Sequence, residues 1–233
     1  MPGSGILSKS KAAKAHLAQV TGGIAAEVTD LRNDVMRALA PLAAMTVEEF
    51  TDVVAASTTA IKTAAATVAA ATTYSGAALN GSVGAGLMSP PRQIVITTAG
   101  VTPADAPANA TITGVDVLGK TISETVNVAQ TAAAATSTKC FAKVTSITLP
   151  AADGVNATLA FGTGTALGLS LPAKSRAGLV ALIAEVVAGA KVTTGTMAAP
   201  AAAGPYGAYT PATAPNGTND YAIFYEYDAT TVL

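Results

Sequence analysis

The sequence predicts a mainly β protein, with an antiparallel β-sandwich or jelly-roll-like core preceded by an N-terminal helical and extended arm. The first observation is a series of β-branched apolar runs between residues 92 and 171, which turn residues separate at spacings typical of antiparallel strands. The second is the alternation of apolar and polar residues along 120–128. The third is an aromatic closing strand at 221–227. We therefore expect an arm over residues 1–90, with one or two short helices, and a β domain over residues 91–233.

Apolar residues recur at helical spacing in the first half of the arm. Spacings of three and four predict a helix over residues 24–39, which Pro41 ends or kinks. Its apolar stripe consists of Ile24, Val28, Leu31, Val35 and Leu39. Two interpretations stay open, because the stripe could pack on the chain's own β domain or dock on a neighbouring subunit. The second interpretation makes these five residues a candidate interface.

The rest of the arm carries weaker signals. A capping-box pattern, TVEE at residues 46–49, predicts a second short helix that runs through Phe50 toward Val54. Residues 55–73 mix Ala and Thr, whose propensities oppose each other, so the type of element stays open there. Residues 74–89 hold four glycines and an Asn-Gly turn signal, which predict an extended loop or arm.

Five strands are predicted in the β core. They cover residues 92–98, 109–117, 120–128, 139–149 and 155–161. The turn between the second and third strands requires a residue that tolerates positive φ, and Gly119 supplies it. Near Gly114 the apolar phase changes by one residue, from Ile112 to Val115 and Val117. That change predicts a β-bulge at Gly114.

The C-terminal third closes the β domain. Leu167 to Leu171 predicts a strand that ends at a proline, whereas residues 174–192 fit a short helix and Val-rich strands nearly equally. Residues 193–219 are dense in Thr, Gly, Ala and Pro and predict a long loop. The closing strand places four side chains on one face, which makes them either the centre of the core or a second candidate interface: Tyr221, Ile223, Tyr225 and Tyr227.

The composition favours association over an isolated soluble existence. Hydrophobic residues make up 50% of the chain and charged residues only 12%, with a formal net charge of −1. The one basic cluster, Lys9, Lys11 and Lys14, is too small for a dedicated nucleic-acid-binding domain. No apolar run reaches the length of about 18 residues that a membrane span requires. The first residues lack the apolar core of a signal peptide, so we expect synthesis in a reducing cytoplasm.

The sequence offers few of the convergent polar groups that common enzyme chemistry requires, although distant carboxylates could still converge in the fold. A single histidine, His16, and a single cysteine, Cys140, cannot build a nucleophilic triad or a metal site of three or four ligands. The glycine-rich stretch 162–168 lacks the Gly-Lys-Ser/Thr of a phosphate-binding loop. Cys140 lies in a strand pattern and is expected to be buried. We therefore expect no enzyme, no catalytic or metal-binding residues and no cofactor.

Several stretches resemble a β module common in virion structural proteins of tailed bacteriophages. The resemblance rests on VDVLGKTISETV at residues 115–126, KCFAKVTSITL at 139–149, the glycine-bounded run at 154–164 and LGL at 167–169. The hairpin residues differ from the Asp-Gly of that module, but Gly119 leaves the turn in place. The resemblance implies no catalytic residues.

This resemblance implies a capsid decoration or cement protein of β-sandwich type that stabilises the head through inter-subunit contacts. We expect the major capsid protein and other virion proteins as partners, a homo-oligomer that could be a trimer, and assembly into the virion in the host cytoplasm. A head fibre, neck or tail component is the alternative within the virion. A carbohydrate-binding or adhesin-like module is the alternative of another class, and it requires exposed rings among Tyr206, Tyr209, Tyr221, Tyr225 and Tyr227.

Overall fold

The computed structural model describes residues 44–176, 179–180, 182–192, 195–198, 200 and 206–227. Contacts group the described residues from Met45 onward into one compact unit. The predicted helix over residues 24–39 lies outside the described residues. The first elements are β1 (Ala44–Phe50), β2 (Ser57–Ala66), β3 (Thr72–Ser75), the 3₁₀ turn η1 (Gly76–Ala78), β4 (Leu87–Gly100), η2 (Pro103–Asp105), β5 (Asn109–Val115), β6 (Thr121–Asn127) and β7 (Ala134–Leu149). The remaining ones are β8 (Ala157–Gly168), β9 (Ser175–Arg176), β10 (Leu179–Val180), β11 (Leu182–Val187), β12 (Ala190–Val192), β13 (Thr196–Ala198), β14 (Ala208–Thr210) and β15 (Tyr221–Tyr227).

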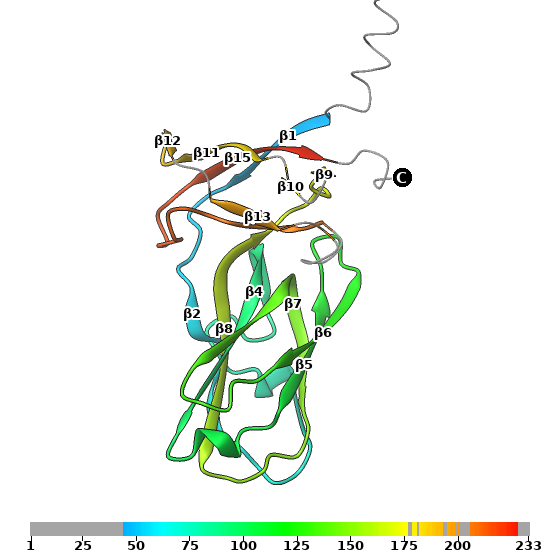
Figure 1. Ribbon diagram of the computed structural model, residues 1–233, viewed down its shortest axis with the longest axis vertical. Coiled ribbons are helices and arrows are strands. Elements are labelled where there is room, and N and C mark those ends of the chain that lie inside the picture. Colours follow the sequence, from blue (N-terminus) through cyan, green and yellow to red (C-terminus); the bar gives the residue numbers. More distant parts are fainter. Residues whose placement is uncertain are drawn as a thin grey trace, which may run out of the picture. The chain divides into compact units, whose positions relative to one another are not determined.

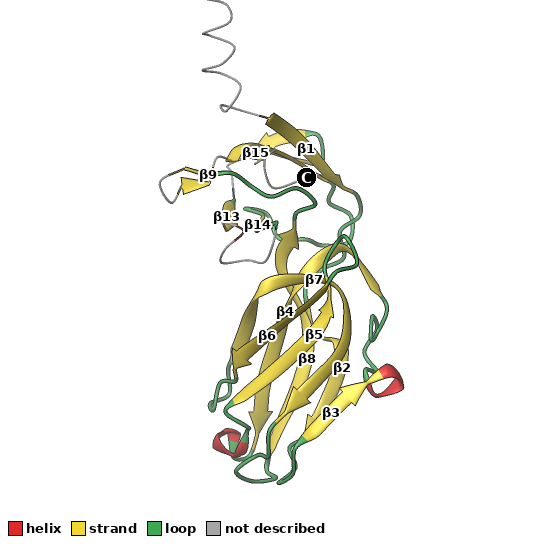
Figure 2. Cartoon of the chain, turned by 90° about the vertical axis from the view of Figure 1, so that its right-hand side faces the viewer, coloured by secondary structure: helices red, strands yellow, loops and turns green. Residues whose placement is uncertain are grey.

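Most of these strands belong to one large antiparallel sheet (Figure 1). Its order in the described chain is β13-β14-β8-β4-β7-β5-β6, with β2 also paired to β8 and β3 also paired to β7. The described helical residues are few, and Figure 2 shows the two 3₁₀ turns as short coils beside long strands. The prediction of a mainly β, antiparallel fold with a sandwich-like core is therefore confirmed.

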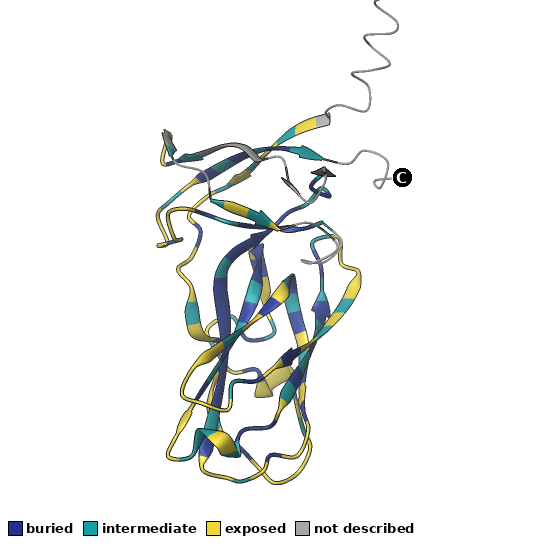
Figure 3. Cartoon of the chain, in the orientation of Figure 1, coloured by how far each residue is buried: buried dark blue, intermediate teal, exposed yellow. Residues whose placement is uncertain are grey.

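The large sheet curls because β7 changes partners along its length. Its first half pairs with β4, and its second half pairs with β3 on one side and β5 on the other. The residues that face inward from the curled sheet form one apolar core, visible as dark blue segments in Figure 3. The largest of them are Ile61, Ile94, Ile96, Ile112, Phe141, Ile147 and Phe161. They come from five different strands, so the sheet and its core depend on each other.

The hairpin of β5 and β6 forms as predicted. Gly119 has φ +80°, and the amide of Asp116 donates to the Lys120 carbonyl at 2.9 Å. The carboxylate of Asp116 accepts from the amides of Leu118 and Lys120, both at 2.9 Å. Asp116 is only 3% exposed, so these bonds fix the turn from the buried side.

The bulge predicted at Gly114 lies on the neighbouring strand instead. Along β5 every second residue is buried without interruption, and β5 pairs with β6 without a register shift. Against β7, however, Thr113 faces Ser146 whereas Gly114 faces Val144, so β7 carries Thr145 as an extra residue. Gly114 points inward, and a Cβ there would lie 2.1 Å from the Lys143 carbonyl oxygen. The apparent change of phase arises because glycine occupies an inward position where an apolar side chain was expected.

A smaller sheet has the order β1-β15-β11-β12 among the described strands. The second short helix, predicted from residue 46 toward Val54, is therefore wrong: residues 44–50 form β1. The capping box is a local signal, whereas Thr46 and Val47 are β-branched and the strand pairs with β15. Its outward residues alternate with inward ones such as Glu48 and Phe50. Tertiary pairing thus overrides the helix signal.

The strands N-terminal to residue 91 are part of the sheets, so the predicted boundary at 90/91 falls inside one compact unit. The stretch left open at residues 55–73 is mostly β2, which pairs with β8. The predicted loop at 193–219 contains the short strands β13 and β14, and β14 continues the large sheet beside β8. Strand structure, rather than a helix, is also found in the described residues of 174–192.

Candidate interaction surface

The closing strand β15 directs its predicted stripe into the protein. Tyr221, Ile223 and Tyr225 are at most 1% exposed, and Tyr227 is half-buried. They pack in a second core with Leu167 and Leu169 of β8 and its extension, together with Val53, Ala173, Val187 and Tyr209. The sequence predicted the alternation along this strand correctly. The inward side chains pack in the second core of the chain itself.

The hydroxyl groups of these tyrosines are satisfied within the chain. The hydroxyl of Tyr221 donates to the carbonyl of Thr213 at 2.9 Å, and that of Tyr225 donates to the carbonyl of Leu171 at 3.1 Å. Buried tyrosines normally require such partners. Three of the five rings that the sugar-binding alternative requires are buried, namely Tyr209, Tyr221 and Tyr225. They cannot form an exposed stacking platform.

The opposite face of β1 and β15 exposes apolar side chains. On β1, Met45 is 57% and Val47 is 45% exposed. Ala222 and Phe224 of β15 are half-buried, as is Val186, which faces Ala222 across the β11 pairing. A cavity of about 280 Å³ lies at one end of this face, between Glu49, Val186, Gly189 and Asp220. We call Met45, Val47, Val186, Ala222 and Phe224 the outer apolar face. The sequence stripe of β15 identified only the side that turned out to be buried.

A buried carboxylate connects β1 to the chain that follows β8. One oxygen of Glu48, Oε1, accepts hydrogen bonds from the amide and the hydroxyl of Ser170. Burial raises the pKa of Glu48 above its ordinary value of 4.5, against the lowering effect of the Ser170 bonds. Burial also raises the pKa of Tyr225 on β15, and the nearby charge of Glu48 adds to that effect. Glu48 is therefore held where its charged form is disfavoured.

This carboxylate should make stability depend on pH. Because the pKa of Glu48 is higher in the folded than in the unfolded state, the folded protein binds the proton more tightly. The free energy of unfolding should be highest below about pH 4.5 for this group and fall as pH rises through the raised pKa. Glu48→Gln, which is neutral at every pH, should lose this part of the pH dependence. Urea unfolding between pH 4 and 8 checks it, and an unchanged difference between the two proteins across that range would contradict it.

The outward face of the large sheet, opposite its apolar core, carries an array of polar side chains. Two rows of hydroxyl side chains cross β3, β7, β5 and β6 in register, and they are Thr73-Thr148-Thr111-Thr125 and Ser75-Ser146-Thr113-Ser123. Neighbours within the rows hydrogen-bond, with 3.1 Å between the hydroxyls of Thr73 and Thr148 and 2.9 Å between those of Thr111 and Thr125. Such cross-strand pairs stabilise a solvated sheet face. The outer apolar face differs from it in chemistry and is the better candidate for a contact with another protein.

Potential metal ligands are scattered in the described part of the chain. No three His, Cys, Asp or Glu side chains come together there as a metal site. Cys140 is 7% exposed, as expected, and burial raises the pKa of its thiol to about 12. A thiol of that kind stays protonated at neutral pH and is a poor nucleophile.

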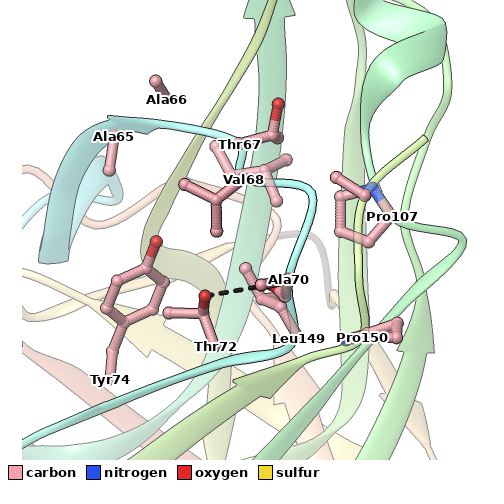
Figure 4. A pocket seen from close by; sticks show the side chains of 12 residues that line it. Ala65, Ala66, Thr67, Val68, Ala70, Thr72, Tyr74, Pro107, Leu149 and Pro150 are labelled. Atoms are coloured by element: carbon pink, nitrogen blue, oxygen red, sulfur yellow. Dashed lines mark hydrogen bonds between the residues drawn. The ribbon is translucent and has the colours of Figure 1, made fainter. Parts of the chain in front are cut away.

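One small cavity lies at the end of the large sheet, between Val68, Tyr74, Pro107, Leu149 and neighbouring residues (Figure 4). Its volume of about 10 Å³ admits roughly one water molecule. The hydroxyl of Thr72 beside it donates to the carbonyl of Ala70 at 3.2 Å. This cavity is a packing gap rather than a ligand site.

Comparison with known protein families, curated proteins and solved structures finds no match to this chain. Within the described residues, the structure also contains no helix with the length and apolarity needed to cross a bilayer.

Proposed function

We propose that this protein is a virion structural protein of a tailed bacteriophage that decorates or cements the capsid. The observation that carries the proposal is the outer apolar face, where Met45, Val47 and Phe224 remain partly exposed on a sheet whose other side packs on the second core. Apolar patches of this kind mark protein contacts. The low charge of the chain and the resemblance of residues 92–171 to phage virion β modules support the same conclusion.

Cementing requires many modest contacts rather than one strong site. A decoration protein is present in many copies, so weak contacts between neighbours add up to a stable shell. In this proposal the outer apolar face lies against the major capsid protein or a second copy of this chain. The stripe Ile24, Val28, Leu31, Val35 and Leu39 is a second candidate contact that the sequence suggests. The buried side of β15 contributes to this contact by holding the small sheet rigid.

A cryo-electron microscopy map of virions tests the proposal. Density for this chain on the capsid lattice, with residues 45 and 47 against a neighbouring subunit, is the expected result. Density confined to the neck, tail or a head fibre would replace the proposal by the alternative within the virion. Absence of the chain from the particle would discard both.

Incorporation of variants makes the test specific for the outer apolar face. Val47→Glu should reduce the amount of this protein in purified particles several-fold, because it places a charge in an apolar contact. Val101→Glu is the matched control, since Val101 is 94% exposed and lies outside that face. Quantitative gel analysis of particles gives both amounts. Equal incorporation of the two variants would remove the outer apolar face from the proposal.

A further inference from the structure

A buried arginine stands at the junction of β2, β4 and β8. Arg92 on β4 is 4% exposed. Its Nε donates to the carbonyl oxygen of Gly164 at 3.0 Å, and Nη2 donates to the same oxygen. Its Nη1 donates to the carbonyl oxygen of Val54 at 2.7 Å. Both acceptors, the carbonyl oxygens of Gly164 and Val54, are neutral backbone groups.

The charge of this guanidinium has no partner of opposite sign among the described residues. Burial lowers the pKa of Arg92, and the groups that act against this effect are the thiol of Cys140 and the phenol of Tyr221 rather than a carboxylate. A guanidinium stays charged even when it is buried, and a buried charge without a counter-ion destabilises the folded state. Buried charges with perturbed pKa values cluster at functional sites.

Arg92 lines a cavity of about 310 Å³. The apolar part of its wall comes from Val54, Val83, Leu87, Met88 and Pro90. At its rim Leu87 is 77% and Val54 is 67% exposed, so the cavity opens to solvent beside apolar side chains. The size lies at the lower end of the range of small-molecule sites, roughly 300–1,000 Å³.

The donors of Arg92 are not exhausted by its contacts. A guanidinium carries five N–H groups, and three donate to Gly164 and Val54. The other two have no acceptor among the described residues, whereas Ser57, Ser82, Ser89 and Thr163 supply hydroxyls to the same cavity wall. The wall of the cavity therefore combines one positive charge with hydroxyl groups and an apolar slot.

We propose that this cavity binds an aliphatic carboxylate, with the carboxylate on Arg92 and the hydrocarbon chain against Val54, Leu87 and Met88. A carboxylate accepts charge-assisted hydrogen bonds from a guanidinium and balances its positive charge. A phosphate is a poorer fit, because it carries up to two charges and the lining contains no lysine or second arginine. The proposal goes beyond the structural function and does not depend on it.

Binding of hexanoate, with 1-hexanol as its uncharged counterpart, tests the site. The purified full chain is titrated with each compound while NMR follows the Arg92 side-chain Nε–H and the methyl groups of Leu87 and Met88. Hexanoate should bind ~10-fold more tightly than 1-hexanol, since only the carboxylate gains a charge-assisted hydrogen bond. Equal affinities, or no shift with either compound, would overturn the proposal and leave Arg92 as a clamp between two carbonyls.

A pair of surface variants tests the place of binding without removing the arginine, whose loss could unfold the protein. Leu87→Asp puts a negative charge at the rim and should weaken hexanoate binding at least ~10-fold. Leu118→Asp is the matched control, because Leu118 is also exposed, at 68%, but lies in the β5–β6 turn outside the cavity. An equal loss in both variants, or in neither, would contradict the assignment of the site.

Discussion

Gly162→Ala should lower the free energy of unfolding by roughly 3 kcal/mol. A Cβ on Gly162 would lie 1.7 Å from the carbonyl oxygen of Ser57 and 2.5 Å from the carbonyl carbon of Thr58. Both are backbone atoms of β2, which cannot move aside without losing its pairing to β8. A urea unfolding curve, with its midpoint and slope, measures the loss.

Gly164→Ala is the matched control, two residues further along β8. Its Cβ would meet only side-chain atoms, Cβ of Gln93 and Cγ2 of Val95, each at 3.3 Å. These neighbours can give by a few tenths of an ångström, so we expect a loss of about 1 kcal/mol or less. If both variants lose equal stability, the close approach of β2 to Gly162 is not what requires glycine there.

The strength of the local signals explains which elements the sequence could predict. The hairpin around Gly119 and the strands of residues 109–149 combine β-branched alternation with turn chemistry, and they form as predicted. β2 has the sequence STTAIKTAAA, whose alanines favour helix as much as the threonines favour strand. Pairing with β8 decides its structure, and that pairing depends on Gly162, about 100 residues away in the chain.

The candidate sites were harder to predict from the sequence, because they too depend on contacts between distant parts of the chain. The alternation of β15 predicted that Tyr221, Ile223 and Tyr225 share a face, but it could not tell a core from an interface. Nothing in the sequence distinguishes Arg92 from an exposed arginine at the start of a strand. Its burial follows from the crossing of residues 54–57 over β4 and β8, which is a tertiary event. The exposed side of β1 was missed because the TVEE pattern predicted a helix.

Tyr225→Ala should lower the free energy of unfolding by about 4 kcal/mol, the range for removing a large buried aromatic ring. Tyr225 is fully buried in the core that joins the small sheet to the end of β8. The core of the large sheet shares no residue with this second core. β8 contributes Leu159 and Phe161 to the core of the large sheet and Leu167 to the second core. The loss should therefore be local to the small sheet.

Native-state hydrogen exchange locates this loss. The amides of β11 and β15 should exchange faster in Tyr225→Ala, whereas those of β4 and β7 should keep their protection. Tyr225→Phe is the matched control: it keeps the ring and removes the hydroxyl that donates to the Leu171 carbonyl, so about 1 kcal/mol should be lost. Faster exchange throughout both sheets would instead mean that β8 couples the two cores into a single cooperative unit. In that case a contact at the outer apolar face would stabilise the whole described fold rather than the small sheet alone.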